Sequence, residues 1–236
     1  MAGGYWRIAS GLLLMPVAVA GFSGCSSSGT STATASVARA SSDTGLTAAQ
    51  LRGALLTRVN GVAAAAPASS GKYSLLAKAN TSTTGANAAQ GTPKTCAGAA
   101  ATGFNLTALA AAPAAAVTFR VGGNGISEVL IAASSAKTAS TALAGHIPAE
   151  CAKYQAKVGG KTYTYGTTEQ KVSGIGQQAQ VLSVQAAGVK SNNRSSLIYR
   201  GKGFVGTVTV VGPNASKEAV TELGMQAYAY AVKSLS

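Results

Sequence analysis

Two adjacent glycines, Gly159-Gly160, separate two runs of residues that favour strands, 151–158 and 161–168. A two-residue glycine turn joins neighbouring antiparallel strands and fixes their register, because the strand residues pair outward from the turn. Successive side chains of a strand point to opposite faces of the sheet. The spacing therefore predicts one β-hairpin that carries three tyrosines on a single face: Tyr154, Tyr163 and Tyr165.

Strand patterns recur over much of the remaining chain. Val117, Phe119 and Val121 alternate with other residues, and a turn at 122–125 leads to a return strand at 126–132. Further strands are expected at 73–77, 179–186, 195–200 and 204–211.

Helical patterns lie between and around these strands. Thr47 and Gln50 form a capping-box signature, and Asn60-Gly61 is expected to end the helix that follows it. Helices are expected at 48–59, at 94–101, from Ser134 or Ser135 to about 145, and from Ser216 to about Lys233. Together the patterns predict an α+β fold, with an antiparallel sheet of about six or seven strands and flanking helices.

The N-terminus has the features of a lipoprotein signal peptide. Arg7 precedes an apolar stretch at 8–20, and the segment ends on Phe22-Ser23-Gly24-Cys25, where small residues stand before a cysteine as in a bacterial lipobox. We expect cleavage after residue 24 and lipidation of Cys25 by acyl chains such as palmitate. The alternative is an ordinary cleavable signal with an incidental cysteine.

Three segments follow from this interpretation. Residues 1–24 are the signal peptide, and 25–45 are the lipidated cysteine with a flexible Ser/Thr/Ala tether. Residues 46–236 are expected to form a single α+β domain. The chain would then be held at the cell membrane by its lipid anchor, on the extracytoplasmic face.

The two remaining cysteines, Cys96 and Cys151, are an even pair in an exported chain. Such a pair favours one disulfide bond, and two free buried thiols are the alternative.

Catalytic and metal-binding motifs are incomplete. Ser134 and Lys137 match the S-x-x-K pattern of penicillin-recognising serine enzymes, but no K-T-G follows. The glycine-rich segment 201–208 is expected to be a turn between strands rather than a nucleotide loop. His146 is the only histidine, and six acidic residues leave few candidates for acid–base or metal chemistry. We therefore expect no catalytic residues, no metal and no cofactor.

The chain carries 19 basic and 6 acidic residues, for a formal net charge of +13. The basic residues are dispersed rather than clustered, so nucleic acid is not an expected partner. Besides the membrane, the candidate partners are an anionic envelope polymer, a lipid or an acidic protein. A merely solvated basic surface is the alternative.

The order of these features resembles that of actinobacterial surface lipoproteins. A lipoprotein signal and polar tether are followed by a cysteine, then Phe119-Arg120-Val121-Gly122-Gly123, a second cysteine (Cys151), Tyr199-Arg200-Gly201 and a closing helix. More loosely, the plan is similar to the extracellular sensor domain of the mycobacterial kinase PknH. The resemblance implies an antiparallel sheet flanked by helices and a cleft for a ligand. That sensor has a second disulfide bond, which this chain lacks.

The predicted function is a lipid-anchored extracytoplasmic binding or sensor-like module without catalytic activity. The three tyrosines are a candidate ligand surface, and packing of helices onto their face of the sheet is the alternative. Two further functions stay open: a carrier of lipid or another apolar ligand, and a serine hydrolase that uses Ser134 and Lys137.

Overall fold

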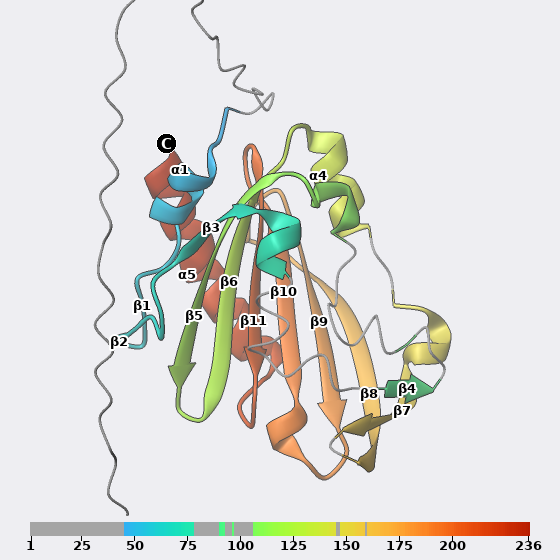
Figure 1. Cartoon of the computed structure of the whole chain (residues 1–236). Coiled ribbons are helices and arrows are strands. Elements are labelled where there is room, and N and C mark those ends of the chain that lie inside the picture. The colour runs from blue at the N-terminus through green and yellow to red at the C-terminus, as the bar shows by residue number, and fades with distance from the viewer. Residues whose placement is uncertain (1–44, 78–89, 93–95, 97–105, 145–146, 159) are drawn as a thin grey trace, which may run out of the picture. The chain divides into compact units, whose positions relative to one another are not determined.

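A single antiparallel sheet dominates the computed structural model, which describes residues 45–77, 90–92, 96, 106–144, 147–158 and 160–236 (Figure 1). Within these residues its strands are β3 (Ser69–Lys72), β4 (Gln90–Thr92), β5 (Pro113–Val121), β6 (Asn124–Ala132), β7 (Lys153–Val158), β8 (Lys161–Val172), β9 (Gln178–Ala186), β10 (Arg194–Arg200) and β11 (Phe204–Val211). They lie in the order β3-β5-β6-β11-β10-β9-β8-β7-β4. The expected α+β class is confirmed, and the seven strands β5 to β11 form the body of the sheet. The short strands β3 and β4 add its two edges.

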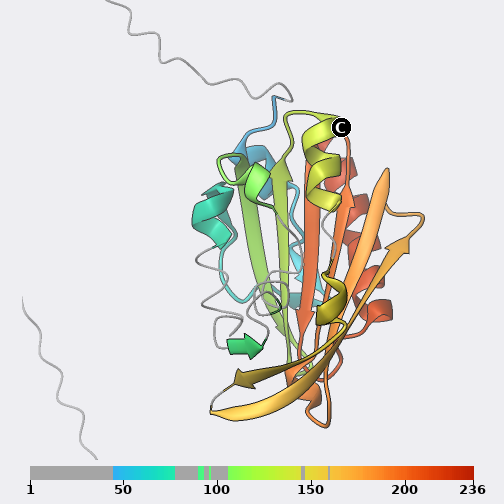
Figure 2. The same cartoon turned by 90° about the vertical axis from the view of Figure 1, so that its right-hand side faces the viewer.

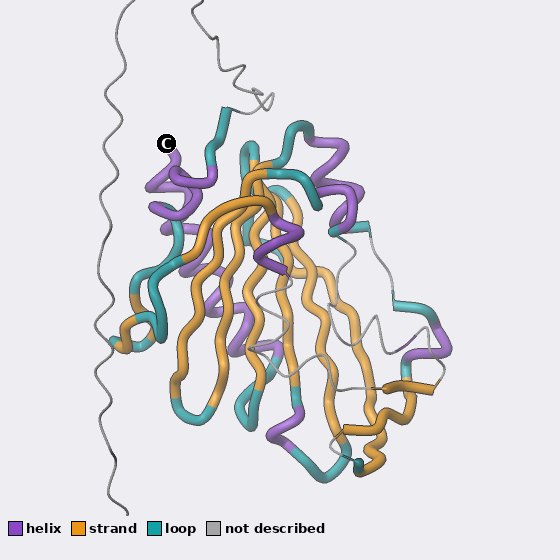
Figure 3. Tube along the Cα trace, in the orientation of Figure 1, coloured by secondary structure: helices purple, strands orange, loops and turns teal. Residues whose placement is uncertain are grey.

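Helices cover both faces of this sheet (Figure 2). On one face, α1 (Ala48–Gly53) and α5 (Lys217–Leu235) share an apolar core with the strands. On the other face, α4 (Ala136–Leu143) and the short 3-10 turn η2 (Thr107–Leu109) cover a second apolar cluster. Two further 3-10 turns flank the tyrosine hairpin and β10: η3 (Ala149–Cys151) and η4 (Lys190–Asn192). Figure 3 shows how much of the described chain is strand.

The two predicted glycine-turn hairpins and the predicted helix starts near residues 48, 135 and 216 are confirmed. Val158 pairs with Lys161 in the β7–β8 hairpin, so its register is the one that the glycine pair predicts. The β5–β6 turn is tight, since Val121 pairs with Asn124 and Gly122 and Gly123 both have positive φ. Positive φ favours glycine because it has no Cβ. Both predicted caps form: the hydroxyl of Ser135 starts α4, and that of Ser216 starts α5.

The first predicted helix, 48–59, is wrong in its C-terminal half. The capping box of Thr47 and Gln50 forms, but α1 ends at Gly53. Residues Arg58–Val59 and Val62–Ala63 instead pair as the two-stranded sheet β1–β2. Asn60 and Gly61 have φ values of 49° and 79°, which suit the central positions of a tight hairpin turn. The Asn-Gly pair therefore makes a hairpin rather than a helix end.

The strand expected at 73–77 is also wrong. Strand β3 lies just before it, at Ser69–Lys72, and residues 73–77 are helical. Of the helix expected at 94–101, only Cys96 lies within the described residues, and Cys96 is helical.

The core under α1 and α5 contains one carboxyl group. Glu128 of β6 is 1% exposed, and burial raises its pKa to about 8. Its Oε2 accepts a hydrogen bond from the backbone nitrogen of Leu56. Tyr199 of β10, fully buried nearby, lies over Gly206 of the adjacent strand β11. The sheet is thus close-packed on this face, and the candidate site lies on the other one.

Candidate functional site

The predicted tyrosines come together on one face of the β7–β8 hairpin. Tyr154 and Tyr165 pair across the two strands, and their rings stack with centroids 5.4 Å apart. Each is 5% exposed, while Tyr163 is half-buried and packs against the same cluster. Two of the three side chains are therefore mostly covered, and Tyr163 is the most accessible.

A disulfide bond between Cys96 and Cys151 lies in this cluster, so the predicted pairing is confirmed. The half of it at Cys151 is held to the hairpin by hydrogen bonds from Thr167. The Thr167 hydroxyl donates to the Cys151 carbonyl at 2.6 Å, and the Thr167 backbone nitrogen donates to the Ala152 carbonyl at 2.9 Å. These hydrogen bonds fix the segment before β7 against β8, and the disulfide ties that segment to Cys96.

Arg194, at the start of β10, is a charged residue of this face that the sequence reasoning missed. It pairs with Val184 of β9, which belongs to the tyrosine and disulfide cluster. Burial lowers the pKa of its guanidinium to about 10, against the opposing effect of Tyr154 and Tyr73. The group is still a cation at neutral pH.

The two tyrosines near Arg194 come from distant parts of the chain. Tyr154 belongs to β7, and Tyr73 directly follows β3, the strand at the far edge of the sheet from β7. Burial raises the pKa of Tyr154 to about 12 and also raises that of Tyr73, while the charge of Arg194 lowers both. Both hydroxyls are therefore protonated at neutral pH and can donate hydrogen bonds.

A row of hydroxyl groups continues from Arg194 across the sheet. The guanidinium Nε donates to Ser196 Oγ at 3.4 Å, and Ser196 Oγ lies 3.0 Å from Thr209 Oγ1. In the strand register the row runs over β10, β11, β6 and β5 as Ser196, Thr209, Ser127 and Thr118. Guanidinium and hydroxyl groups gathered on one face can bind an anionic oxygen ligand.

The S-x-x-K match lies at the start of α4, where the neighbouring serine has a structural role. Ser135 caps α4, since its hydroxyl accepts from the backbone nitrogen of Thr138 at 3.1 Å. Ser134 and Lys137 are exposed at the same helix start. The glycine-rich segment forms the β10–β11 connection, as expected, where Gly201 N donates to Phe204 O at 3.0 Å.

Two predicted residues, Cys25 and His146, lie outside the described residues. Within the part that the structure describes, no three His, Cys, Asp or Glu side chains gather closely enough to hold a metal ion. No helix in that part is both long and apolar enough to cross a membrane.

Comparison with known proteins gives loose structural likeness alone. No family model and no curated protein matches the sequence. The extracellular domain of PknH from Mycobacterium tuberculosis aligns with a TM-score of 0.36 and 11% identity, over 52% of this chain and 63% of that one. The Rv0999 ortholog from Mycobacterium smegmatis aligns with a TM-score of 0.38 and 14% identity, over 74% and 86%. The loose resemblance to the PknH domain noted from the sequence is thus confirmed.

Proposed function

We propose that the protein is a lipid-anchored extracytoplasmic module that binds a small anionic ligand without converting it. The observation that carries this proposal is that Arg194 shares one face of the sheet with Tyr154 and with the hydroxyl row that begins at Ser196, while its charge also acts on Tyr73. Arg194, Tyr154 and Tyr73 come from three elements that only the folded sheet brings together.

The donors of this site suit an acidic oxygen group. A guanidinium offers several N–H groups in a fixed plane, which match a carboxylate or phosphate, and tyrosine hydroxyls add neutral donors. Partial burial strengthens each of these interactions, because the local dielectric is lower than that of water. The stacked rings of Tyr154 and Tyr165 give the site a rigid wall.

The anchor and the location are supported by the chain's chemistry. Cys25 follows an apolar segment and small residues, as in a lipobox, and the tether after it leads into the described domain. A disulfide bond persists in oxidising compartments outside the cytosol, which agrees with export. Replacing Cys25 with alanine should release the protein into the medium, and retention in the membrane fraction would contradict the anchor.

Ligand binding is tested with small anions and a matched arginine control. Inorganic phosphate and citrate should raise the melting temperature of the purified domain, and Arg194→Gln should abolish that rise. Tyr154→Phe, which keeps the ring, should reduce it. Arg120 is exposed on β5 of the same sheet face, so Arg120→Gln should leave the rise unchanged. An equal loss in both arginine variants would refute the site.

The carrier function and this proposal differ in whether the purified protein contains bound lipid. Mass spectrometry of an organic extract from protein purified from its host should show no stoichiometric lipid if the ligand is a small anion. The hydrolase alternative predicts labelling of Ser134 by a serine-reactive probe, whereas the binding module predicts none.

A further inference from the structure

The outer face of the β7–β8 hairpin carries a polar groove on the side opposite the tyrosines. Strand alternation turns Lys153, Gln155 and Lys157 away from Tyr154 and the disulfide. Across the hairpin, Gln155 pairs with Thr164 and Lys157 with Thr162. Lysine, amide and hydroxyl groups therefore follow one another along a single face.

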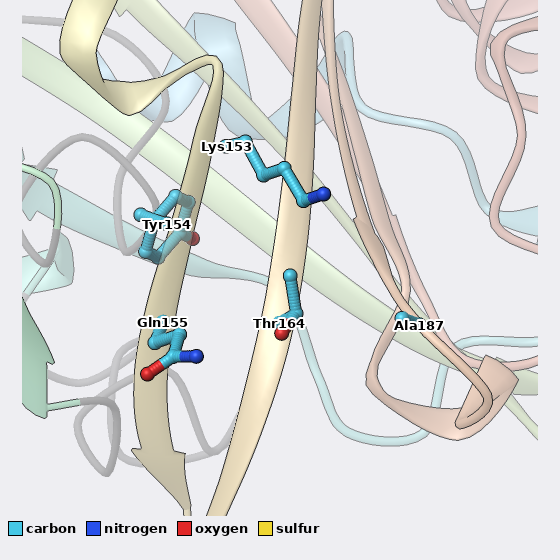
Figure 4. Close-up of a pocket in the computed structure, with 5 residues that line it drawn as sticks. All are labelled: Lys153, Tyr154, Gln155, Thr164 and Ala187. Carbon is cyan, nitrogen blue, oxygen red and sulfur yellow. The ribbon is translucent and has the colours of Figure 1, made fainter.

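A hollow of about 690 Å³ lies at this face, lined by Lys153, Tyr154, Gln155, Thr164 and Ala187. Figure 4 shows Lys153 and Gln155 extending from β7 toward β8, where Thr164 lies, with Ala187 beyond it. The backbone nitrogen of Ala187 donates to the carbonyl of Thr164 at 2.8 Å, which fixes that wall. We call this hollow, together with Lys157 and Thr162, the Lys153 groove.

The charges of the hairpin favour an anion. Strands β7 and β8 carry four lysines and one glutamate. That glutamate, Glu169, lies on the opposite face, where it accepts hydrogen bonds from the Gln180 side chain and the Ile147 backbone. None of the five residues that line the hollow is acidic. The potential in the groove is therefore positive, and its amide and hydroxyl groups can both donate and accept hydrogen bonds.

The spacing of the lysines points to a polymer rather than to a single acid. Lys153 and Lys157 are four strand residues apart, or about 13 Å. A chain that carries an acidic group on each of several units can contact both lysines at once, since their backbone positions lie along one strand. The hollow has the size of a small-ligand site, about 300–1,000 Å³, but is polar where drug-like sites are apolar.

A protein partner fits this surface less well. Stable protein interfaces bury about 800 Å² on each side and depend on large aromatic or apolar anchors. Among the described residues, the exposed large hydrophobic side chains lie outside β7 and β8: Val62, Leu75, Met225, Tyr230 and Val232.

We propose that the Lys153 groove binds an acidic polysaccharide. Lys153 and Lys157 contact two acidic groups of one chain, and Gln155, Thr162 and Thr164 hydrogen-bond the sugar hydroxyls between them. This site goes beyond the proposed function: Tyr154 lines both sites, but Lys153, Gln155 and Thr164 lie on the opposite face of the sheet from Arg194.

The test measures affinity for hexagalacturonate, a carboxylate-bearing oligosaccharide, with uncharged maltohexaose as the neutral control. The wild-type domain should bind the acidic sugar and not the neutral one. Lys153→Gln/Lys157→Gln should weaken binding at least about tenfold. The matched control is Lys161→Gln/Lys171→Gln, which removes the same charge from exposed lysines on the other face of the hairpin and should change the affinity less than about twofold.

Three outcomes would overturn the proposal. Equal weakening in both double variants would mean that net charge alone attracts the sugar. Failure of the wild type to bind hexagalacturonate would refute the acidic polysaccharide, and binding of poly(glycerol phosphate) in a parallel assay would identify a phosphate polymer in its place. If neither polymer binds but vesicles of phosphatidylglycerol do, the face contacts membrane rather than glycan. Arg194→Gln should leave sugar binding unchanged, which keeps this site distinct from the small-anion site.

Discussion

The Oε2 atom of Glu128 accepts a 2.8 Å hydrogen bond from the backbone nitrogen of Leu56, a residue 72 positions earlier in the chain. This contact joins the segment after α1 to the centre of the sheet. The other oxygen, Oε1, is buried and makes no hydrogen bond with the part of the chain that the structure describes. Tyr199, whose pKa is raised by burial and by the charge of Glu128, lies in the same core. Because burial raises the pKa of Glu128 to about 8, its carboxyl group is mainly neutral at pH 7, and it acts on Tyr199 as a charge only at higher pH.

This burial predicts that stability falls as pH rises. The ordinary pKa of 4.5 applies in the unfolded chain, and the folded value is about 8, so between these values the folded state binds the extra proton. The free energy of unfolding should then decrease by up to about 1.4 kcal/mol per pH unit from this group, and the decrease should stop above about pH 8. Urea unfolding at pH 5, 6.5, 8 and 9 measures it.

Glu128→Gln is the matched variant, since glutamine is neutral at every pH and can still accept from Leu56. Its unfolding free energy should lack this pH dependence. Glu222→Gln on the exposed face of α5 should keep it. The same slope in wild type and Glu128→Gln would show that another group causes it.

Asn124 should stabilise the fold through its side chain. Its Nδ2 donates to the carbonyls of Val121 and Gly122 at 3.1 and 3.2 Å, and its Oδ1 accepts from the backbone nitrogen of Asn214 at 3.0 Å. Asn124→Ala removes all three of these part-buried hydrogen bonds and should cost about 1–3 kcal/mol. Asn214→Ala keeps its backbone donor and should be nearly neutral. Comparable losses in chemical denaturation would contradict this role.

Gly206 is required by the ring of Tyr199. A Cβ at position 206 would overlap the Tyr199 ring, whereas a Cβ at Gly125, in the neighbouring strand β6, meets nothing within 4 Å. Gly206→Ala should therefore lower the unfolding free energy by about 1–3 kcal/mol or more, and Gly125→Ala should change it little. The melting temperatures of the two variants test this. Tyr199→Leu in the Gly206→Ala background should recover part of the loss, and a neutral Gly206→Ala would disprove the close contact.

The disulfide should contribute strongly to stability, because it joins cysteines 55 residues apart. In the chain-entropy model a loop of this size is worth about 4 kcal/mol. Cys96→Ala/Cys151→Ala should lower the unfolding free energy by roughly that amount, measured by denaturant titration. Cys25→Ala, which removes a cysteine outside this pair, should leave the unfolding free energy of the domain unchanged.

Most strands in the body of the sheet, and the register of the β7–β8 hairpin, could be predicted from sequence because they depend on local signals. The β7–β8 pairing follows from a two-residue glycine turn, and the stripe of Val220, Leu223, Ala227 and Ala231 in α5 is buried as helical spacing requires. The Asn60-Gly61 turn was misassigned because the same pair can end a helix or close a hairpin, and only pairing of the flanking residues decides between them.

The candidate site was predicted only in part, for a physical reason. The three tyrosines lie within one hairpin, so their shared face follows from alternation. Arg194 and Tyr73 join them through the order of the strands, which no local pattern encodes. The edge strand β3, Ser69–Lys72, contains no β-branched residue and so gives no strand signal.

The connection between Val158 and Lys161 controls more than a turn. Because side chains alternate along both strands, insertion or deletion of one residue there would shift the hairpin out of phase. If β7 shifted, it would present Lys153 and Lys157 to the disulfide cluster and Tyr154 to the opposite face. A change in the length of this turn would thus disturb both faces of the sheet at once, while any substitution within either strand alters only one.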